Sequence, residues 1–269
     1  MGLISGKSRK EVGLALGSGV ARGLAHIGVL RILEQEGIHI DMIAGTSMGA
    51  LVGAFFAYGQ SVEQMEKLAI NMGTKRLSFL FDPVLPKTGL IRGRKMEETL
   101  KRVIGGTTFH DLTMPFACVA TDISNGDEIV IKEGMVWEAI RASSTVPVVL
   151  ALVKREGRYL IDGTLVNPVP VSVVKAMGAD FIIAVNVIPH RETPGKTEPN
   201  LFTVVMQTLY ISSYQFIQAS LEGADIVIEP KVDEIGYADF HHARECILQG
   251  ELAAKKAIPE IKRRLTFSK

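Results

Sequence analysis

The sequence is poor in cysteine and aromatic residues and has no excess of either charge, and each shortage excludes a class of protein. Its two cysteines, Cys118 and Cys246, lie far apart and match no metal-ligand spacing, so we expect two buried thiols in a reducing compartment and no metal site. With 30 Lys and Arg against 29 Asp and Glu, the chain has no basic surplus for nucleic-acid phosphates. Aromatic residues make up only 6% while glycines number 26, which favours an α/β protein over an aromatic-rich β-sandwich.

Long uninterrupted apolar segments are also missing. The apolar run near the N-terminus is shorter than the ~7–15 residues of a signal-peptide core, and Gly6 stands where a myristoylation signal has Ser or Thr. The most apolar stretch, residues 42–58, is broken by Thr46, Ser47 and glycines and does not reach the ~20 residues of a membrane-spanning helix. At 47% hydrophobic residues and a net charge of +1, the chain is also not disordered. We therefore expect a folded cytoplasmic protein whose contact with membranes is at most peripheral.

Strand-like and helix-like apolar patterns alternate along the chain. The strand patterns lie at residues 11–16, 38–44, 116–121, 128–132, 158–161, 181–187 and 225–229. The helical patterns lie at residues 21–35, 49–58, 61–71, 95–104, 137–142, 171–177 and 240–265, and residues 75–94 form an irregular excursion rich in proline and glycine. This alternation predicts an α/β fold with a mostly parallel central sheet flanked by helices on both faces, in three layers.

The strongest chemical signal is the pentapeptide Gly45-Thr46-Ser47-Met48-Gly49, between an expected strand and an expected helix. In a G-x-S-x-G elbow the serine occupies a strained turn that exposes its hydroxyl above the sheet. The flanking glycines, Gly45 and Gly49, let the strand and helix approach where a Cβ would collide. The pattern therefore predicts that Ser47 is a nucleophile.

A second glycine-rich segment, residues 17–23 (GSGVARG), also lies between a strand and a helix, where backbone N–H groups can bind an anion. It is not a P-loop, because no Gly-Lys-Ser/Thr follows. A dinucleotide fingerprint would use Asp41, but Asp41 falls inside the next expected strand instead of at its end. The remaining interpretation is an oxyanion hole for Ser47, to which Arg22 could add positive charge or in which Arg22 could simply cap the helix.

A nucleophilic serine needs a base, and the residues alone leave two candidates open. The chain has six histidines, of which only His190 follows an apolar strand closely, and His26 lies within the first expected helix. The alternative is Asp162, at the end of an expected strand and directly before Gly163. A carboxylate is a weak base, but burial and contact with the serine hydroxyl can raise its basicity.

Two segments resemble the patatin-like phospholipase family. Residues 14–54 (LALGSGVARGLAHIGVLRILEQEGIHIDMIAGTSMGALVGA) resemble the opening of the family's domain, and residues 142–180 (ASSTVPVVLALVKREGRYLIDGTLVNPVPVSVVKAMGAD) resemble its closing segment. The resemblance implies residues 11–180 as the catalytic domain, after a tail of residues 1–10. Residues 181–269 would supply strands and helices that complete the same domain.

The resemblance also implies a chemistry. It assigns Ser47 as nucleophile and Asp162 as base, without a catalytic histidine, and places Ser18, Gly19, Val20 and Arg22 in the oxyanion loop. Family members hydrolyse acyl esters of phospholipids and lysophospholipids, and the small bacterial-type members do so without a metal, so we expect no cofactor, a lipid substrate and transient contact with a membrane surface. Residues 75–94 would be a candidate lid over the lipid site.

Three positions depart from the family pattern. Ser18 and Val20 stand where glycine is common, and the β-branched Val20 restricts φ. Thr164 stands where the family has glycine or alanine after the Asp-Gly pair, which predicts more polar surroundings for Asp162. These departures motivate a second hypothesis, a lipid- or acyl-binding regulator on the same fold that turns over poorly.

Overall fold

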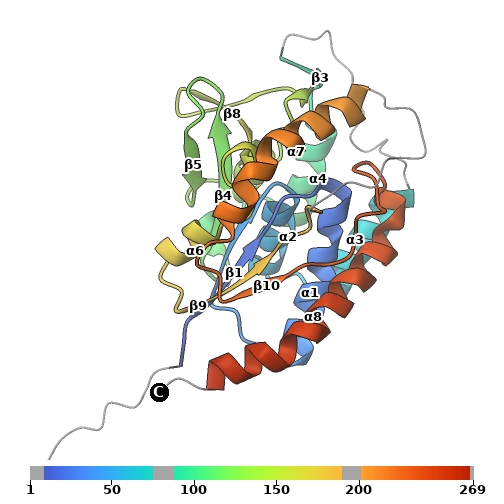
Figure 1. Cartoon of the computed structure of the whole chain (residues 1–269). Helices are drawn as coiled ribbons and strands as arrows, with labels where there is room; N and C mark the ends of the chain where they lie inside the picture. Colours follow the sequence, from blue (N-terminus) through green and yellow to red (C-terminus); the bar gives the residue numbers. More distant parts are fainter. Residues whose placement is uncertain (1–8, 75–87, 190–200, 267–269) are drawn as a thin grey trace, which may run out of the picture.

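The structure of the protein is a computed structural model that describes residues 9–74, 88–189 and 201–266 (Figure 1). Within these residues the main sheet has eight strands: β1 (Val12–Leu16), β2 (Met42–Thr46), β4 (Phe116–Asp122), β5 (Glu128–Ile131), β7 (Val153–Arg155), β8 (Arg158–Asp162), β9 (Phe181–Val185) and β10 (Ile226–Ile228). Their order is β10-β9-β1-β2-β4-β8-β7, with β5 also paired to β4. Strands β10 to β4 run parallel, and the pairings of β4 with β5 and β8, and of β7 with β8, are antiparallel. The sheet is therefore mixed and mostly parallel.

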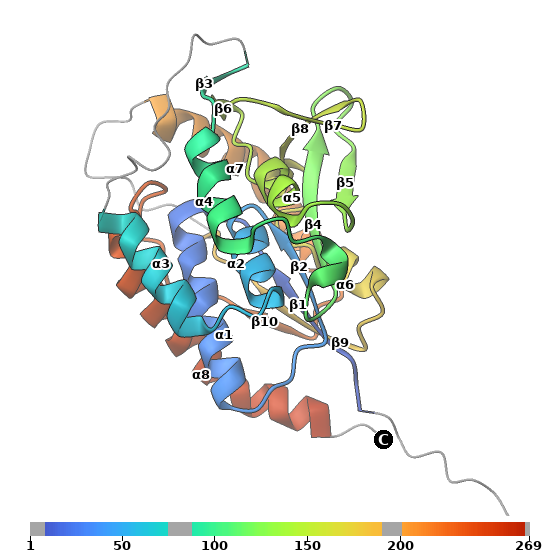
Figure 2. The ribbon, with the colours of Figure 1, turned by 180° about the vertical axis from the view of Figure 1, so that it is seen from behind.

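Helices cover both faces of this sheet. They are α1 (Ala25–Gln35), α2 (Met48–Ala57), α3 (Val62–Thr74), α4 (Arg94–Ile104), α5 (Val136–Ser143), α6 (Val171–Ala176), α7 (Leu201–Ser220) and α8 (Ala243–Thr266). Helices α1 and α2 lie against one face, with α8 outside α1 (Figure 2), whereas α6 and α7 lie on the other face (Figure 1). This arrangement confirms the predicted α/β class with helices on both faces.

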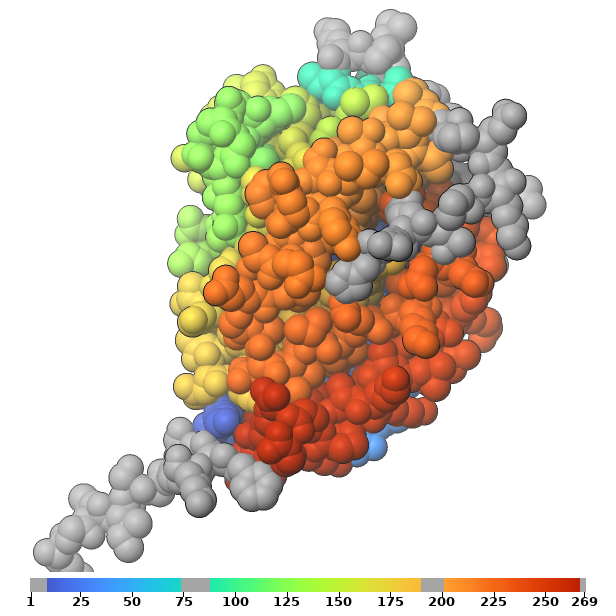
Figure 3. Space-filling model, viewed as in Figure 1, coloured from blue at the N-terminus to red at the C-terminus, as the bar shows by residue number. Residues whose placement is uncertain are grey.

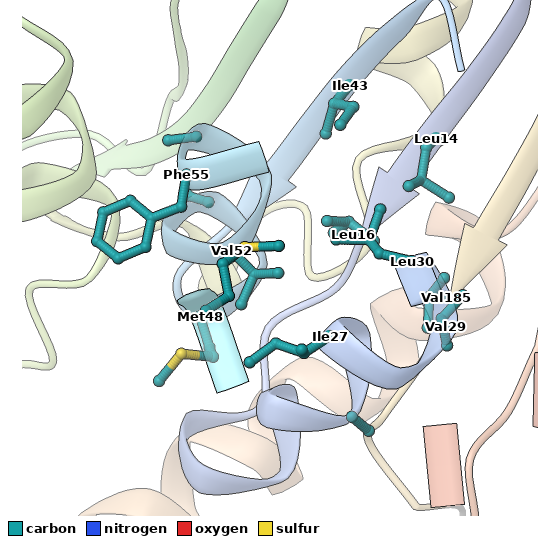
Figure 4. Close-up of a cluster of buried hydrophobic side chains, with 14 of the residues drawn as sticks. Leu14, Leu16, Ile27, Val29, Leu30, Ile43, Met48, Val52, Phe55 and Val185 are labelled. Atoms are coloured by element: carbon teal, nitrogen blue, oxygen red, sulfur yellow. The ribbon is translucent and has the colours of Figure 1, made fainter. Parts of the chain in front are cut away.

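The core divides at the sheet because successive strand residues point to opposite faces. Leu14 and Leu16 of β1 pack into the larger cluster with residues of α1 and α2 (Figure 4). Ala15, between them, belongs to the second cluster with Val171 and Val174 of α6. Every residue of β1 is buried, as is typical of a parallel strand covered on both sides.

The C-terminal part of the chain extends the same sheet. Strand β9 pairs with β1 and β10 pairs with β9, so the last two strands continue the order that β1 and β2 begin. Helix α8 crosses α1 closely: a Cβ on Gly28 would lie 1.9 Å from Ile247 O, and one on Gly250 would lie 2.0 Å from Ala25 O. The two helices touch backbone to backbone where both carry glycine.

Several elements differ from the sequence-based expectations. Helix α7, strand β7 and the short parallel pair β3 (Gly89–Ile91) and β6 (Val148–Leu150) had no assignment. The expected helix at residues 21–35 begins as a 3-10 helix, η1 (Val20–Leu24), and the strand expected from residue 38 begins only at Met42. Of the candidate lid, residues 75–87 lie outside the described residues, and the rest forms β3 and the start of α4.

Candidate active site

Strand β4 lies between the strands that carry the expected nucleophile and the expected base. On one side β2 runs parallel, with Thr46 opposite Val119, and on the other β8 runs antiparallel, with Asp162 opposite Ala120. Ser47 follows Thr46 just as Ala120 follows Val119, so the register brings Ser47 and Asp162 to one level of the sheet. Two residues 115 positions apart in the chain therefore meet across a single strand.

The turn at Ser47 is strained and closely packed. Its backbone has φ +55° and ψ −116°, a conformation that L-residues rarely adopt. A Cβ on Gly45 would lie 2.4 Å from Gly49 O, and one on Gly49 would lie 2.1 Å from Leu16 O. Only glycine fits on either side of the serine, as the elbow motif predicts.

The hydroxyl of Ser47 donates a hydrogen bond to Asp162 Oδ2 at 2.6 Å, and both residues are buried, with 5% and 4% exposure. The other carboxylate oxygen, Oδ1, accepts hydrogen bonds from Thr164 N–H at 2.9 Å and Thr164 Oγ1 at 2.6 Å. The backbone of Asp162 is fixed as well, because its N–H donates to Thr145 O and its C=O accepts from Thr121 Oγ1, each at 2.9 Å. Of the two open candidates, the structure brings Asp162 to the serine.

Burial raises the pKa of the Asp162 carboxyl, and the hydrogen bonds from Ser47 and Thr164 oppose that rise. A raised pKa makes the carboxylate a stronger base than an ordinary aspartate and brings it closer to neutral operating pH. Thr164, which departs from the family pattern, provides the more polar surroundings that the sequence predicts.

Two further hydroxyl groups hold the backbone around the pair. Ser143 Oγ accepts a hydrogen bond from Ser47 N–H at 2.9 Å and donates one to Val119 O at 2.6 Å, so it links the elbow to β4. Thr46 Oγ1 donates to Asn167 O at 2.8 Å. A Cβ on Gly163 would lie 2.4 Å from Val119 O, so the turn after Asp162 also requires glycine.

The glycine-rich loop follows β1 just as the elbow follows β2, so both lie at the carboxyl ends of adjacent parallel strands. Two of its four expected oxyanion residues have their N–H groups occupied: Ser18 N–H donates to Pro168 O at 2.9 Å, and Arg22 N–H donates to Gly19 O at 3.0 Å. In the described part of the chain, the N–H groups of Gly19 and Val20 have no acceptor. The loop therefore offers two adjacent backbone donors, not four.

The side chains of this loop do not act as free charges. The Arg22 side chain is buried, and its Nε donates to Ile235 O at 2.6 Å instead of remaining a solvated charge. Val20 has φ +48°, which is rare for a β-branched residue, and lines the same cavity as Ser47. A β-branched side chain therefore occupies a backbone conformation that glycine adopts more easily, at a position where the family commonly has glycine.

No described histidine hydrogen-bonds to Ser47 or Asp162. His26 is fully buried, its Nε2 lies 2.7 Å from Gly17 O, and burial lowers its pKa to about 4, so the ring is neutral. Its N–H therefore donates to the carbonyl that opens the glycine-rich loop. His39, His110, His241 and His242 are exposed, and His190 lies outside the described residues.

Ser47 opens into an apolar cavity of about 710 Å³. The cavity extends along one face of α2, where Met48, Leu51 and Phe55 recur at helical spacing from the serine. The other lining residues are Val20, Leu68, Met72, Leu90, Ile91, Met96, Thr99, Leu100, Val103, Ser144, Val146, Val148, Val149, Leu150, Leu201, Phe202, Val205 and Phe240. None of these described residues carries a charge, so the cavity suits a hydrocarbon chain.

Sequence reasoning did not identify several residues of this site. Ser143 and Thr145 lie at the start of the segment that resembles the family, but the sequence assigns them no role, because their contacts depend on the pairing of β4 with β2 and β8. Helix α7, which contributes Leu201 and Phe202 to the cavity, was not assigned. A long segment without charged residues, residues 201–220, was the feature that would have indicated it.

Other groups in the described residues form no second centre. No group of three or more His, Cys, Asp or Glu side chains among them is arranged so that it could hold a metal ion. Cys118 and Cys246 are unpaired and buried, and burial raises the pKa of each thiol to about 12. No helix in the described ranges has the length and apolar character to cross a membrane.

The fold and the site together define an α/β protein in which a serine at a strand–turn–helix elbow contacts a buried aspartate. The chain belongs to the patatin-like phospholipase family, whose model matches residues 14–175, more than half of its length. That match includes both the glycine-rich loop and the Ser47–Asp162 pair.

Similar proteins agree with this assignment. An uncharacterized NTE family protein of Mycobacterium bovis is 36% identical over 199 residues, which are 74% of this chain and 55% of that protein. Lysophospholipase NTE1 of Pyricularia oryzae is 30% identical over 90% of this chain and 18% of that protein. Patatin-like phospholipase domain-containing protein 6 of Mus musculus is 34% identical over 68% of this chain and 14% of that protein. The chain thus spans from about half to a seventh of the relatives it matches.

Among solved structures, VipD from Legionella pneumophila superposes with a TM-score of 0.55, over 94% of this chain and 67% of that one. The sequences are only 11% identical, so this likeness concerns the fold alone.

Proposed function

We propose that this protein is a serine acyl hydrolase that cleaves acyl esters of phospholipids or lysophospholipids with a Ser47–Asp162 dyad. The observation that carries the proposal is the 2.6 Å hydrogen bond to a buried carboxylate from the Oγ of Ser47, which lines a cavity without charged residues. A serine needs a base within hydrogen-bonding reach, and Asp162 is the one titratable group among the described residues that Ser47 Oγ contacts in this way.

Acylation would begin when Asp162 Oδ2 takes the proton of Ser47 and Oγ attacks the ester carbonyl carbon. The carbonyl π bond opens and its electron pair moves to the oxygen, and we assign its stabilisation to the N–H groups of Gly19 and Val20, which have no other acceptor among the described residues. As the tetrahedral intermediate collapses, the ester C–O bond breaks. The leaving alkoxide takes the proton from Asp162 and departs as an alcohol, which leaves an acyl–Ser47 ester.

Deacylation would reverse these roles with water as the nucleophile. Asp162 takes a proton from water, and the hydroxide oxygen attacks the acyl carbon. The second intermediate collapses with return of the proton to Ser47 Oγ and release of a fatty acid. Because the same carboxylate accepts and returns each proton, the cycle needs no histidine.

The proposed substrate class comes from the cavity and from the relatives. A lining without charge excludes the polar head group and accepts an acyl chain, so the ester carbonyl would lie at Ser47 with the chain along α2. Two of the similar proteins are named as a lysophospholipase and as a patatin-like phospholipase domain-containing protein. We infer the same substrate class for this chain.

Activity on lysophospholipids and p-nitrophenyl esters, together with labelling by a fluorophosphonate, tests the proposal. We expect hydrolysis and labelling in the wild type, neither in Ser47→Ala, and wild-type values in the matched control Ser124→Ala, whose serine lies on an exposed turn. Absence of both labelling and turnover would contradict an activated serine and would favour the binding regulator, since a silent binder stays unmodified.

The dinucleotide alternative has no support at its key residue. The Asp41 carboxylate pairs with Arg9 and accepts a hydrogen bond from Val12 N–H at 2.8 Å, so it holds the start of β1 instead of a ribose. The expected acidic ligand is therefore already occupied.

We further propose that α7 contacts the surface of a phospholipid bilayer or micelle. The helix buries Met206 and Tyr210 on one side, and on the other it exposes an apolar stripe that contains Leu201, Val204 and Ile211, at 61%, 50% and 67% exposure. Figure 3 shows α7 lying across the visible face of the molecule. Because Leu201 also lines the cavity, the stripe continues into the acyl site, and a lipid surface is the partner that would deliver a chain there.

Sedimentation with phosphatidylcholine vesicles tests this contact. We expect Ile211→Glu to reduce the bound fraction while hydrolysis of a short soluble ester is kept. The matched control is Leu248→Glu, an equally apolar residue with 50% exposure on α8, away from the cavity lining. Equal losses in both variants would refute a specific role for α7.

A further inference from the structure

The 3-10 helix η1 is tied to a distant segment, residues 235–237, by three contacts that all lie next to the proposed oxyanion donors. Arg22 Nε donates to Ile235 O at 2.6 Å, and the guanidinium carbon lies 4.5 Å from the centroid of the Tyr237 ring. Ala21 N–H also donates to Tyr237 O, at 3.3 Å. Arg22 and Tyr237 are each only 4% exposed, so these contacts are shielded from solvent.

We propose that Arg22 is a positioning residue that clamps residues 235–237 onto η1 and so holds the N–H groups of Gly19 and Val20 in the direction of the oxyanion. This inference rests on the proposed acyl hydrolase function. It gives Arg22 a mechanical role, in contrast to the electrostatic role that its charge first suggests.

The loop needs such a clamp because its conformation is not one that its residues favour. Val20 has φ +48°, and a β-branched residue leaves that region unless its surroundings hold it there. The N–H of Arg22 closes the turn onto Gly19 O at 3.0 Å, so any displacement of Arg22 is passed directly to the two free donors. A guanidinium that is fixed at both its Nε and its face restricts this displacement.

The clamp extends from the loop to α7. The Tyr237 ring stacks on Tyr210 of α7, with centroids 4.7 Å apart and planes 9° from parallel. Tyr237 Oη is buried and has no hydrogen-bond partner among the described residues, so the ring and not the hydroxyl makes the contacts. Shape and stacking therefore determine what position 237 contributes, and phenylalanine should replace tyrosine there.

The variants that test the clamp are Arg22→Met, Arg22→Lys, Tyr237→Leu and Tyr237→Phe, each assayed on the full chain with a p-nitrophenyl ester. We expect kcat to fall about 10–100-fold in Arg22→Met and Tyr237→Leu with little change in KM, because misdirected donors weaken the transition state and not substrate binding. Arg22→Lys should fall between, since an ammonium cannot keep both contacts. Tyr237→Phe should restore most of kcat.

A second measurement separates positioning from damage to the fold. A trifluoromethyl ketone forms a hemiketal with a nucleophilic serine and places an oxyanion in the hole. Its inhibition constant should rise in Arg22→Met and Tyr237→Leu by the same factor as kcat/KM falls. A general loss of folding would instead lower the amount of labelled enzyme and leave the constant of the remaining enzyme unchanged.

Three outcomes would overturn the clamp. They are wild-type kcat in Arg22→Met, full rescue by Arg22→Lys with no effect of Tyr237→Leu, and inhibitor binding that is unchanged in active variants. The second outcome would assign the effect to charge alone. Absence of hydrolysis and labelling in the wild type would instead refute the proposed function, and with it the clamp, so the two failures are distinguishable.

Discussion

The parallel and antiparallel parts of the sheet hold their halves of the site by different means. On the parallel side, Ser47 and Val20 occupy positive-φ backbone, and Gly45 and Gly49 are packed so closely that no Cβ fits. On the antiparallel side, Asp162 has ordinary dihedrals, φ −51° and ψ +135°, and is held by hydrogen bonds. The nucleophile is thus fixed by steric constraint of the backbone, and the base is fixed by polar contacts.

This difference predicts how each half responds to substitution. An added Cβ at a closely packed backbone position destabilises the fold sharply, because it meets carbonyl groups that cannot move independently. Hydrogen bonds to a carboxylate are graded, since each one shifts the balance between its charged and neutral forms. Substitutions that add a Cβ beside Ser47 should therefore damage folding, whereas substitutions of the hydroxyl groups around Asp162 should tune the chemistry. Gly163 is the exception on the antiparallel side, because a Cβ there would lie 2.4 Å from Val119 O.

Among changes that leave the nucleophile in place, the largest effect on activity is expected for Asp162→Asn, which keeps the shape of the base and removes its basicity. We expect kcat to fall about 10³–10⁴-fold, the usual contribution of a general base combined with orientation of the nucleophile. Hydrolysis of a p-nitrophenyl ester measures this loss, and activity close to wild type would refute the dyad.

The stability of Asp162→Asn should not fall at neutral pH. Burial raises the folded-state pKa of Asp162, so the carboxyl contributes its full stability only when protonated, below the unfolded pKa of about 3.8. That contribution is lost as pH rises through the folded pKa. At pH 7 the neutral amide avoids the cost of a buried charge, and we expect a Tm equal to or above that of the wild type.

The next effect concerns folding on the parallel side. Gly49→Ala would place a Cβ 2.1 Å from Leu16 O, and we expect a loss of about 3 kcal/mol or more in the free energy of unfolding. The matched control is Gly106→Ala, where nothing lies within 4 Å of the added Cβ. Urea unfolding compares the two, and equal stability of both variants would show that the elbow tolerates a Cβ.

The same contrast explains what the sequence could predict. The elbow and the glycine-rich loop are local patterns, since a strand, a glycine pair and a helix follow one another within a few residues. Their positions and the α/β class were therefore accessible, as was the order of most strands and helices. Residues 45–49 alone specify the turn that holds Ser47.

The base and its supports depend on pairings between distant strands. Nothing local to Asp162 shows that β8 runs antiparallel to β4, and that pairing decides which titratable group meets Ser47. Ser143 and Thr145 act through backbone groups on other elements, and the engagement of Arg22 with Ile235 depends on a loop more than 200 residues away. Helix α7 was missed because its apolar residues extend around much of its circumference and give a weak helical period.

A smaller effect on stability and activity is expected at Ser143, which links the elbow of Ser47 to β4. Ser143→Ala removes the hydroxyl that accepts from Ser47 N–H, and it leaves that buried N–H without its acceptor. We expect a loss of about 1–3 kcal/mol in unfolding free energy and a moderate fall in kcat. Ser143→Thr keeps the hydroxyl and is the conservative comparison. Wild-type stability in Ser143→Ala would mean that the strained turn at Ser47 does not depend on this hydrogen bond.

The smallest effect should be a displacement of the pH profile in Thr164→Val. Valine keeps the branched shape but loses the hydroxyl that donates to Asp162 Oδ1 at 2.6 Å, while the backbone N–H at position 164 still donates. Removal of a donor to the carboxylate favours its neutral form, so the pKa of Asp162 should rise further. Because the carboxylate is the active form, the acidic limb of the kcat/KM profile should move to higher pH, with the plateau above it little changed.

Thr164→Ser, which restores the donor, should return the limb toward its original position. If the limb moves to lower pH or does not move, the threonine hydroxyl does not set the basicity of Asp162. In that case hydrogen bonds from side chains would not tune the base, and the proposed contrast between the two sides of the sheet would fail.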